Sequence, residues 1–284
     1  MGSVLSRPSA DGGGALSDKQ RQRRSTFTAF VKALDGKLLT APAEESECEA
    51  TPTIRGVAYT ALVTSFGVHL VRLVLRDVLR KQSWYAAVEH PGMFELCALG
   101  SVHAAALAAY GLKKCFAPRT TWLDPRGCKR LCAVSLGYFL HDFLSLRSMW
   151  SQDPAMIVHH SMGILLLGGV LRKPAVYPIV APFAVIELST VFLNMMTMMT
   201  MAGKKGGAMF NANLGCFVST FFVTRILWMP YITAKFMNKE PLVQLGATRW
   251  GLVVLSCLNV YWFRGIIAKI ARAMAAPAAA AATS

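Results

Sequence analysis

The chain has 284 residues, of which 54% are hydrophobic and 16% are charged. Its mean hydropathy of +0.41 excludes an ordinary soluble domain, and the apolar residues gather in long runs. The formal net charge is +15, but the basic residues lie mostly between the apolar runs, where they anchor helix ends to lipid headgroups. We therefore predict an all-α polytopic membrane protein whose partners are membrane lipids, and no binding of nucleic acid.

The N-terminal extension, residues 1–50, is polar and is expected to be mostly disordered. It begins with MGSVLS, which matches the pattern in which Gly2 is myristoylated once Met1 is removed. Within it, apolar residues recur at helical spacing over residues 25–40. This spacing predicts an amphipathic helix that lies on the membrane surface or packs on the membrane domain.

Seven apolar runs follow, each close to the roughly 20 residues that a helix needs to cross a bilayer. The connections are short, so residues 51–270 are predicted to form one transmembrane domain, and residues 271–284 a low-complexity tail. The predicted spans are Ile54–Leu75, Gly92–Leu112, Leu131–Arg147, Ala155–Leu171, Ala175–Met201, Ala208–Thr233 and Leu242–Ala268.

Three ionisable side chains flank the connection between the third and fourth spans. Asp142 lies near the end of one span and His159 and His160 near the start of the next, so all three belong to one membrane face, here called the His side. Ionisable groups inside spans are costly, which makes them functional candidates; the alternative is neutral packing between helices. Because adjacent helical residues point about 100° apart, we expect one His to face a chamber and the other to bond a neighbouring helix.

Further polar residues fall at similar depth when each helix is followed at about 1.5 Å per residue. They are Glu187, Thr190 and Asn194 on the fifth span, Asn211 and Asn213 on the sixth and Asn259 on the seventh. Their number favours a polar chamber open to the His side over isolated bonds between helices. Counted in the same way, Arg225 lies in the half of the membrane away from the His side. There it would pair with a carboxylate, reach the far interface or bind a lipid headgroup.

Five short motifs occur in order across about residues 90–270. They are G-Y-F-L-x-D at Gly137–Asp142, the His159–His160 pair, E-L-S-T-x-F-L-N at Glu187–Asn194, T-R-I-L-x-x-P at Thr224–Pro230 and L-N-x-x-W at Leu258–Trp262. The ordered set resembles the TLC-domain family, which includes ceramide synthases and TRAM proteins, and is most similar to its small transmembrane members. The resemblance implies a ring of six helices around a cavity, with one preceding helix. We assign the motif residues Tyr138, His141, Arg225 and Trp262 to this cavity.

In ceramide synthases, the His pair is followed by an H-D-x-x-D-x-x-L-E pattern, and His and Asp together carry acyl transfer from acyl-CoA to a long-chain base. Aligning the L-E end on Ile186–Glu187 places Val180 and Phe183 at the two Asp positions. Both carboxylates are therefore missing, and a catalytic His would lack the partner that fixes its tautomer. Asp142 is the alternative partner.

Three functions stay open at this stage. The first is a lipid-binding or lipid-sensing protein of membrane lipid homeostasis, in the endoplasmic reticulum, another endomembrane or the plasma membrane. The second is an acyltransferase that takes acyl-CoA as substrate, with His159 or His160 as base or nucleophile and Asp142 or Glu187 orienting it. A transporter is disfavoured because no inverted repeat with broken helices is evident.

No cofactor is predicted, and no metal site, because His141, His159 and His160 lack metal-ligand spacing. The sequence leaves the oligomeric state open, a homodimer included. It also leaves the membrane orientation open, because basic loop residues balance between the two faces.

Overall fold

The computed structural model describes residues 53–116, 125–147 and 153–282. Within these ranges the chain is helical and has no β-strand, which confirms the all-α prediction. The N-terminal extension, with Gly2 and the helix predicted over residues 25–40, lies outside the described residues.

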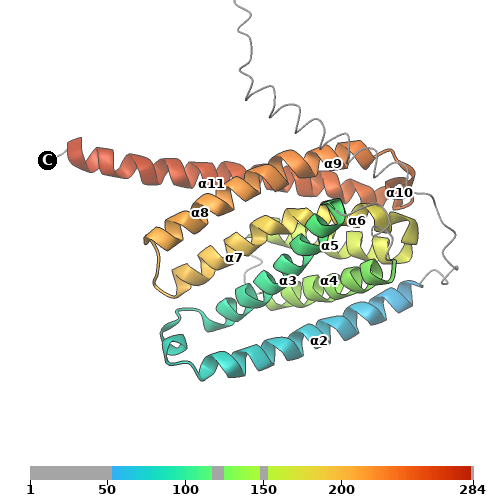
Figure 1. Ribbon diagram of the computed structural model, residues 1–284, viewed down its shortest axis with the longest axis horizontal. Helices are drawn as coiled ribbons and strands as arrows, with labels where there is room; N and C mark the ends of the chain where they lie inside the picture. Colours follow the sequence, from blue (N-terminus) through green and yellow to red (C-terminus); the bar gives the residue numbers. More distant parts are fainter. Residues whose placement is uncertain (1–52, 117–124, 148–152, 283–284) are drawn as a thin grey trace, which may run out of the picture. The chain divides into compact units, whose positions relative to one another are not determined.

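The described helices form seven columns (Figure 1). The first four are α2 (Ile54–Arg80), α3 (Pro91–Phe116), α4 (Pro125–Ser145) and α5 (Pro154–Arg172), with the 3₁₀ turn η1 (Ser83–Ala87) between α2 and α3. The fifth combines η4 (Pro174–Val176), α6 (Tyr177–Ala184), η5 (Val185–Glu187) and α7 (Leu188–Met201). The sixth combines α8 (Ala208–Phe221), the π-helical η6 (Phe222–Trp228) and α9 (Met229–Phe236). The seventh is α11 (Gly251–Ala282), preceded by the short α10 (Glu240–Val243) and η7 (Gly246–Trp250).

Six of these columns are long and apolar enough to cross a membrane, which confirms a polytopic membrane protein. The sequence predicts seven spans, and the column that does not meet these criteria is α4. It begins at Pro125, six residues before the predicted span, and so takes in Arg126, Lys129 and Arg130. With 21 residues, α4 is about 31 Å long, and it packs between α2 and α5.

The helix ends follow from local sequence. The Thr53 hydroxyl caps α2 by accepting from the Gly56 amide at 3.1 Å. Asp153 caps α5 in the same way, and Pro154 occupies the first helical position, where its missing N–H costs no helical hydrogen bond. In the α7–α8 connection, Gly203 and Gly206 have φ of +69° and +86°, a conformation that other residues rarely adopt.

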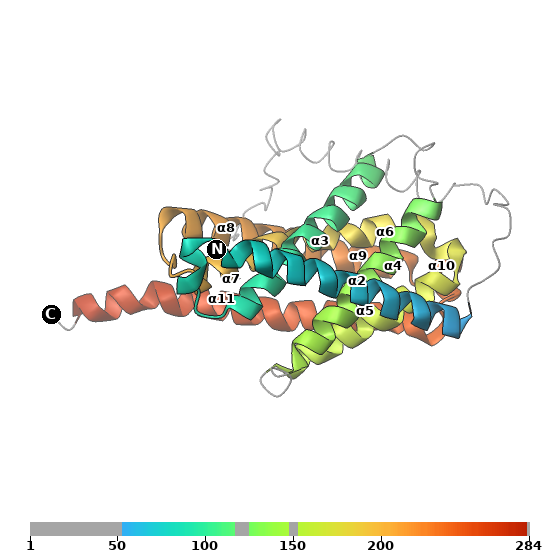
Figure 2. The ribbon, with the colours of Figure 1, turned by 90° about the horizontal axis from the view of Figure 1, so that it is seen from below.

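The six columns from α3 to α11 close into a ring through their contacts. Around the ring, α3 contacts α4, α4 contacts α5, α5 contacts α11, and α11 contacts η6 and α9; α7 contacts α8 and completes the circuit by packing on α3. The first helix, α2, packs against α4 from outside and runs across the near side of the bundle in Figure 2. This arrangement is the ring of six helices with one preceding helix that the family resemblance implies.

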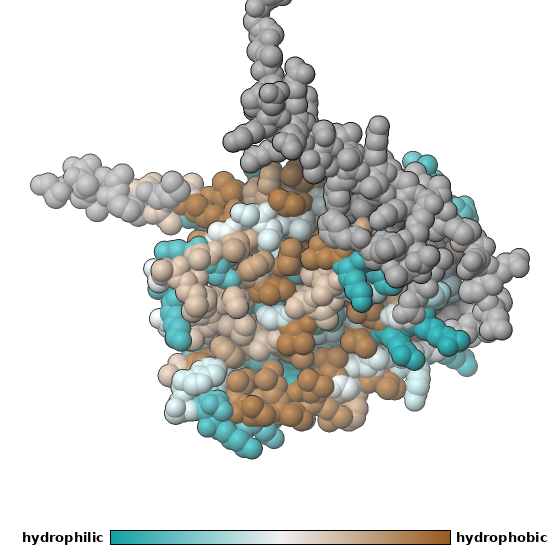
Figure 3. Space-filling model, in the orientation of Figure 1, coloured by the Kyte–Doolittle hydropathy of each residue, from teal (hydrophilic) through white to brown (hydrophobic). Residues whose placement is uncertain are grey.

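The outer face of α2 is apolar. Leu62, Phe66 and Val74 are each 63% exposed, and hydrophobic residues cover much of this part of the surface, with hydrophilic residues toward its ends (Figure 3). An uncovered apolar face of this length suits contact with lipid chains.

The last helix differs from its predicted bounds at both ends. The predicted start at Leu242 falls in α10, and α11 begins only at Gly251, because the chain turns at Gly246 with φ of +58°. At the other end, α11 continues to Ala282, through most of the segment predicted as a low-complexity tail, and projects past the other helices (Figure 1).

Candidate functional site

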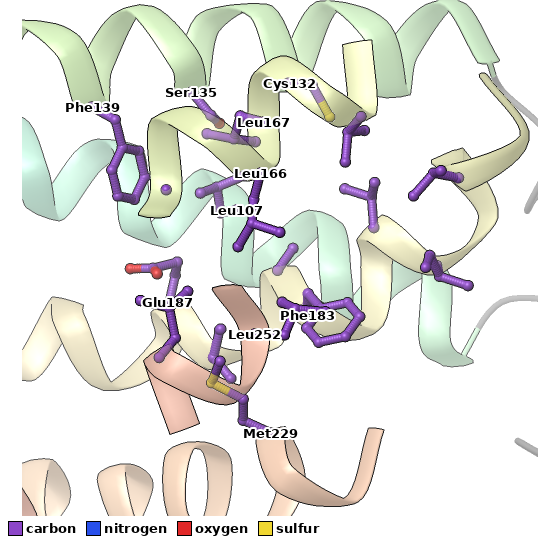
Figure 4. Close-up of a pocket in the computed structure, with 18 of the residues that line it drawn as sticks. Leu107, Cys132, Ser135, Phe139, Leu166, Leu167, Phe183, Glu187, Met229 and Leu252 are labelled. Carbon is purple, nitrogen blue, oxygen red and sulfur yellow. The ribbon is translucent and has the colours of Figure 1, made fainter. Parts of the chain in front are cut away.

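A cavity of about 160 Å³ lies inside the ring (Figure 4). All six columns of the ring contribute to its wall, and α2 does not. The wall is mostly aliphatic and aromatic, with a few polar residues. Representative apolar members are Leu107 on α3, Phe139 on α4, Leu167 on α5, Val180 and Phe183 on α6, Met229 on α9 and Leu252 on α11.

Four polar residues of the wall, His159, Glu187, Arg225 and Asn259, form what we call the polar end of the cavity. Arg225, a residue that is 7% exposed, is its centre. Nε donates to the Ser189 hydroxyl at 2.7 Å, and Nη1 donates to the Asn259 side-chain oxygen at 3.4 Å. Arg225 therefore belongs to the polar layer, although counting depth along the helix places it in the far half of the membrane.

The second terminal nitrogen of Arg225 faces the fifth column. Nη2 donates to the Thr190 hydroxyl at 2.7 Å and lies 3.6 Å from Glu187 Oε1. Thr190 in turn donates to Glu187 Oε2 at 2.7 Å. Of the options that the sequence left for Arg225, the structure selects a carboxylate partner.

Both members of this ion pair sit where the helix departs from α geometry. Glu187 belongs to the 3₁₀ segment η5, which follows Pro182, a residue without an N–H to donate along the helix. Arg225 belongs to the π-helical η6. Trp228, the last residue of η6, donates from its indole nitrogen to the Pro182 carbonyl at 2.8 Å. Short 3₁₀ and π segments inside long helices often mark functional sites.

The two adjacent histidines have different environments. His160 is buried, with one ring nitrogen 2.7 Å from Asp142 Oδ2 on α4 and the other 3.0 Å from the Met156 carbonyl. His159 lines the cavity instead, and its ring lies 5.4 Å from that of Trp262. No described residue forms a hydrogen bond with His159. One His thus faces the cavity and the other bonds a neighbouring helix, as the helical spacing predicts.

Several residues assigned to the cavity lie elsewhere in the bundle. Tyr138 stacks on His103 with ring centroids 4.0 Å apart. Tyr138 and Asn194 both lie against Gly100, where an added Cβ would come within 2.7 Å of the Tyr138 hydroxyl and 2.8 Å of the Asn194 amide. The absence of a side chain at Gly100 therefore permits the close approach of α3, α4 and α7.

Three further assignments also fall outside this cavity wall. His141 is buried beside His69 of α2, with ring centroids 5.6 Å apart. Asn211 is exposed, whereas Asn213, two residues on, is buried and donates to the Phe192 carbonyl at 2.9 Å. Trp262 supports His159 without lining the cavity.

The cavity also runs in the opposite direction from the predicted chamber. From the polar end, its apolar wall extends to Val176, Leu242 and Leu245, which belong to the segments η4 and α10 and the turn after α10, at the face opposite the His side. The expected wet chamber is thus a mostly apolar cavity with a polar inner end. In the described part of the chain, no three His, Cys, Asp or Glu residues group as metal ligands would.

Comparison with known proteins places these observations in a family. The family model for the TLC domain matches residues 93–268. The chain belongs to the TLC-domain family. TLC domain-containing protein 4 of Xenopus tropicalis is 34% identical over 165 residues, which are 53% of this chain and 61% of that protein.

Two more TLC-domain relatives match in part. TLC domain-containing protein 4-A of Xenopus laevis shows the same identity and coverage, and TLC domain-containing protein 4 C of Dictyostelium discoideum is 32% identical over 108 residues. The chain thus spans about three fifths of the length of the frog proteins. No solved structure gives a significant match.

Within the TLC domain, the matched motifs supply the polar end. The E-L-S-T-x-F-L-N motif provides Glu187, Ser189 and Thr190, and the T-R-I-L-x-x-P motif provides Arg225. Ser189 was not singled out from the sequence, although its place in the motif and its spacing beside Glu187 could have indicated it. Val180 and Phe183, which the motif comparison in the sequence places at the two Asp positions, form part of the apolar wall.

A second Arg–Glu pair, also missed from the sequence, lies at the His-side end of α2 and α3; we call Arg72, Tyr85 and Glu95 the α2–α3 clamp. Arg72 Nε lies 3.2 Å from Glu95 Oε2, and the Tyr85 hydroxyl donates to Glu95 Oε1 at 2.9 Å. Arg72 also donates to the Gly92 carbonyl at 3.2 Å. Burial, reinforced by the bond to Glu95, raises the pKa of Tyr85 to about 12.

Proposed function

We propose that this TLC-domain protein binds or senses a lipid acyl chain in its intramembrane cavity and acts in membrane lipid homeostasis, in the endoplasmic reticulum or another endomembrane. The observation that carries the proposal is the cavity itself: a wall of leucine, valine and phenylalanine with the polar end at one extremity. Apolar cavities of comparable volume bind small hydrocarbons, and a few placed polar groups fix the orientation of a bound ligand.

The test is lipid analysis of the purified full-length chain by mass spectrometry. Leu167→Trp places an indole in the cavity wall and should remove the bound lipid. Leu165→Trp is the matched control, because it lies two residues away on the same helix with its side chain 55% exposed toward the outside. Equal lipid content in wild type and both variants would contradict binding in this cavity.

A second candidate function, acyl transfer from acyl-CoA, is favoured by the position of His159. Its imidazole faces the cavity with no protein hydrogen bond among the described residues, so one nitrogen can accept a proton. As a hydroxyl or amine acceptor attacks the thioester carbonyl, His159 would take the acceptor's proton and pass it to the departing CoA thiolate. His160 suits this role less well, because Asp142 and Met156 engage both of its ring nitrogens.

This second candidate is tested by supplying purified protein with acyl-CoA and a panel of amine, lysolipid and glycerol-phosphate acceptors. If the protein is an acyltransferase, His159→Ala should lower product formation by about 10²- to 10⁴-fold. Absence of product with every acceptor, together with lipid that copurifies with wild type and His159→Ala, would leave the binding function alone.

A further inference from the structure

We propose that the cavity selects lipids whose headgroup is uncharged and both donates and accepts a hydrogen bond, such as a long-chain alcohol, a monoacylglycerol or a fatty amide. This inference rests on the proposed lipid-binding function and names the chemistry of the ligand. It follows from the charge and the hydrogen-bonding capacity of the polar end.

The charges at the polar end cancel. Glu187 and Arg225 lie 3.6 Å apart with opposite charge, and their side chains are 15% and 8% exposed. His159 forms no ion pair among the described residues. The nearby Asp142 lies 2.7 Å from a ring nitrogen of His160 and does not line the cavity. A ligand that enters the cavity therefore meets a site with no net charge to neutralise.

Arg225 offers little to an incoming anion. A guanidinium carries five N–H donors in a fixed fork, and Ser189, Thr190, Asn259 and Glu187 already face them. A bidentate carboxylate or phosphate needs two parallel free donors on one face of the guanidinium. The contacts within the protein engage three of the five donors, and an anion that approached the remaining two would come close to the Glu187 carboxylate, 3.6 Å from Nη2.

Hydrogen-bonding capacity remains on the other two groups. Glu187 Oε1 is 3.6 Å from Arg225, which is longer than a hydrogen bond, so this oxygen keeps its ability to accept. A neutral His159 contributes one donor and one acceptor. A hydroxyl or an amide can satisfy both residues at once, since each group donates and accepts.

A charged headgroup fits less well. A carboxylate would come to lie beside the Glu187 carboxylate, and an ammonium would come to lie beside the Arg225 guanidinium. In either case, one charge without a counter-charge is added to a site surrounded by apolar residues. Burying such a charge is far more costly than burying a neutral group whose hydrogen bonds are made.

The test uses full-length protein in nanodiscs loaded with tritiated oleyl alcohol. Unlabelled oleyl alcohol, oleamide, oleate and oleylamine compete for the site, at a pH at which oleate is ionised and oleylamine is protonated. The four competitors share one chain, so only the headgroup varies. Oleyl alcohol and oleamide should displace the label at concentrations on the order of a hundredfold lower than oleate or oleylamine.

Glu187→Gln sharpens the test, because it keeps the shape of the side chain and removes its charge. Arg225 is then uncompensated, so oleate should gain on the order of tenfold in affinity and oleylamine should weaken further. Glu89→Gln, at a side chain that is 72% exposed outside the cavity, is the matched control and should leave the order of affinities unchanged.

The outcomes separate the two proposals. If all four lipids compete equally, or if oleate competes best, headgroup selectivity is overturned while lipid binding stands. If none binds to wild type, the lipid-binding function falls and the selectivity with it. If Glu187→Gln elutes as a folded protein but retains the wild-type order, the charge argument is overturned. If that variant does not fold, the competition of the four lipids for wild-type protein decides whether the cavity selects uncharged headgroups.

Discussion

Two Arg–Glu pairs join helices in the part of the chain that the structure describes, and their surroundings differ. In the α2–α3 clamp, Glu95 is 2% exposed and receives bonds from Arg72 and Tyr85 at the end of the bundle. In the polar end, Glu187 and Arg225 lie in the middle of their columns and border the cavity. The clamp residues do not line that cavity.

The comparison shows why an ionisable residue inside a span is an ambiguous signal. The same residue types, at similar distances, connect helix ends in one place and form the wall of a cavity in the other. The difference lies in the neighbouring space and not in the pair itself. Breaking each pair should therefore have separable effects on stability and on lipid binding.

The largest effect is expected from Arg225→Leu. This change leaves the Glu187 carboxylate without its counter-charge in an apolar surrounding, and it should lower the free energy of unfolding by about 3–5 kcal/mol and abolish lipid binding. Denaturation by SDS, followed by far-UV circular dichroism, measures the first effect. The double variant Arg225→Leu/Glu187→Leu should recover much of the stability; a double variant as unstable as the single one would contradict the pairing.

A smaller effect is expected from Arg72→Met. The Arg72 side chain is 20% exposed at the end of the bundle, so loss of its bonds to Glu95 should cost about 2 kcal/mol of unfolding free energy. Lipid content, measured by mass spectrometry, should stay at the wild-type level. If Arg72→Met loses lipid as completely as Arg225→Leu, the distinction between the two pairs is wrong.

The smallest effect is expected from Tyr85→Phe, which removes one hydrogen bond to Glu95 and should cost about 1 kcal/mol near neutral pH. The phenol of Tyr85 has a pKa of about 12 in the folded protein and 10 ordinarily, so it favours the folded state fully below pH 10. That contribution is lost as the pH rises through 12. Wild type should therefore lose more stability than Tyr85→Phe between pH 10 and 12, and parallel pH profiles would contradict this.

The ring of helices could be predicted from the sequence, because length and apolarity are requirements of the bilayer itself. The polar end could be predicted in part: depth counting placed Glu187 and Asn259 in one layer. It excluded Arg225 because the depth was counted from the start of the sixth span against the thickness of one bilayer, whereas the sixth column, Ala208–Phe236, has 29 residues and Arg225 lies near its middle. Asn211 was wrongly included because depth ignores direction, and residues two apart on a helix, such as Asn211 and Asn213, point about 200° apart.

The apolar wall could not be predicted in the same way. In a soluble protein, the polar face of a helix marks the side that faces water, and the opposite side is the core. In a membrane helix, residues that face lipid and residues that face an apolar cavity are chosen from the same set. On α5, Leu165 and Leu167 are identical in kind, yet the first is 55% exposed and the second lines the cavity.

The π-helical segment η6 has a consequence for insertions and deletions. A π turn closes its hydrogen bond one residue later than an α turn, so the chain through Phe222–Trp228 is wound more loosely than α8 before it. Deleting one residue there would let the whole column become a continuous α-helix, with little loss of helix content. Because the looser winding of η6 already takes up one extra residue, the side chains beyond the deletion, Met229 among them, would keep nearly the direction that they have now. The change would fall within η6 itself, so a shortened protein of this kind would keep the α9 part of the lining and lose the present placement of Arg225.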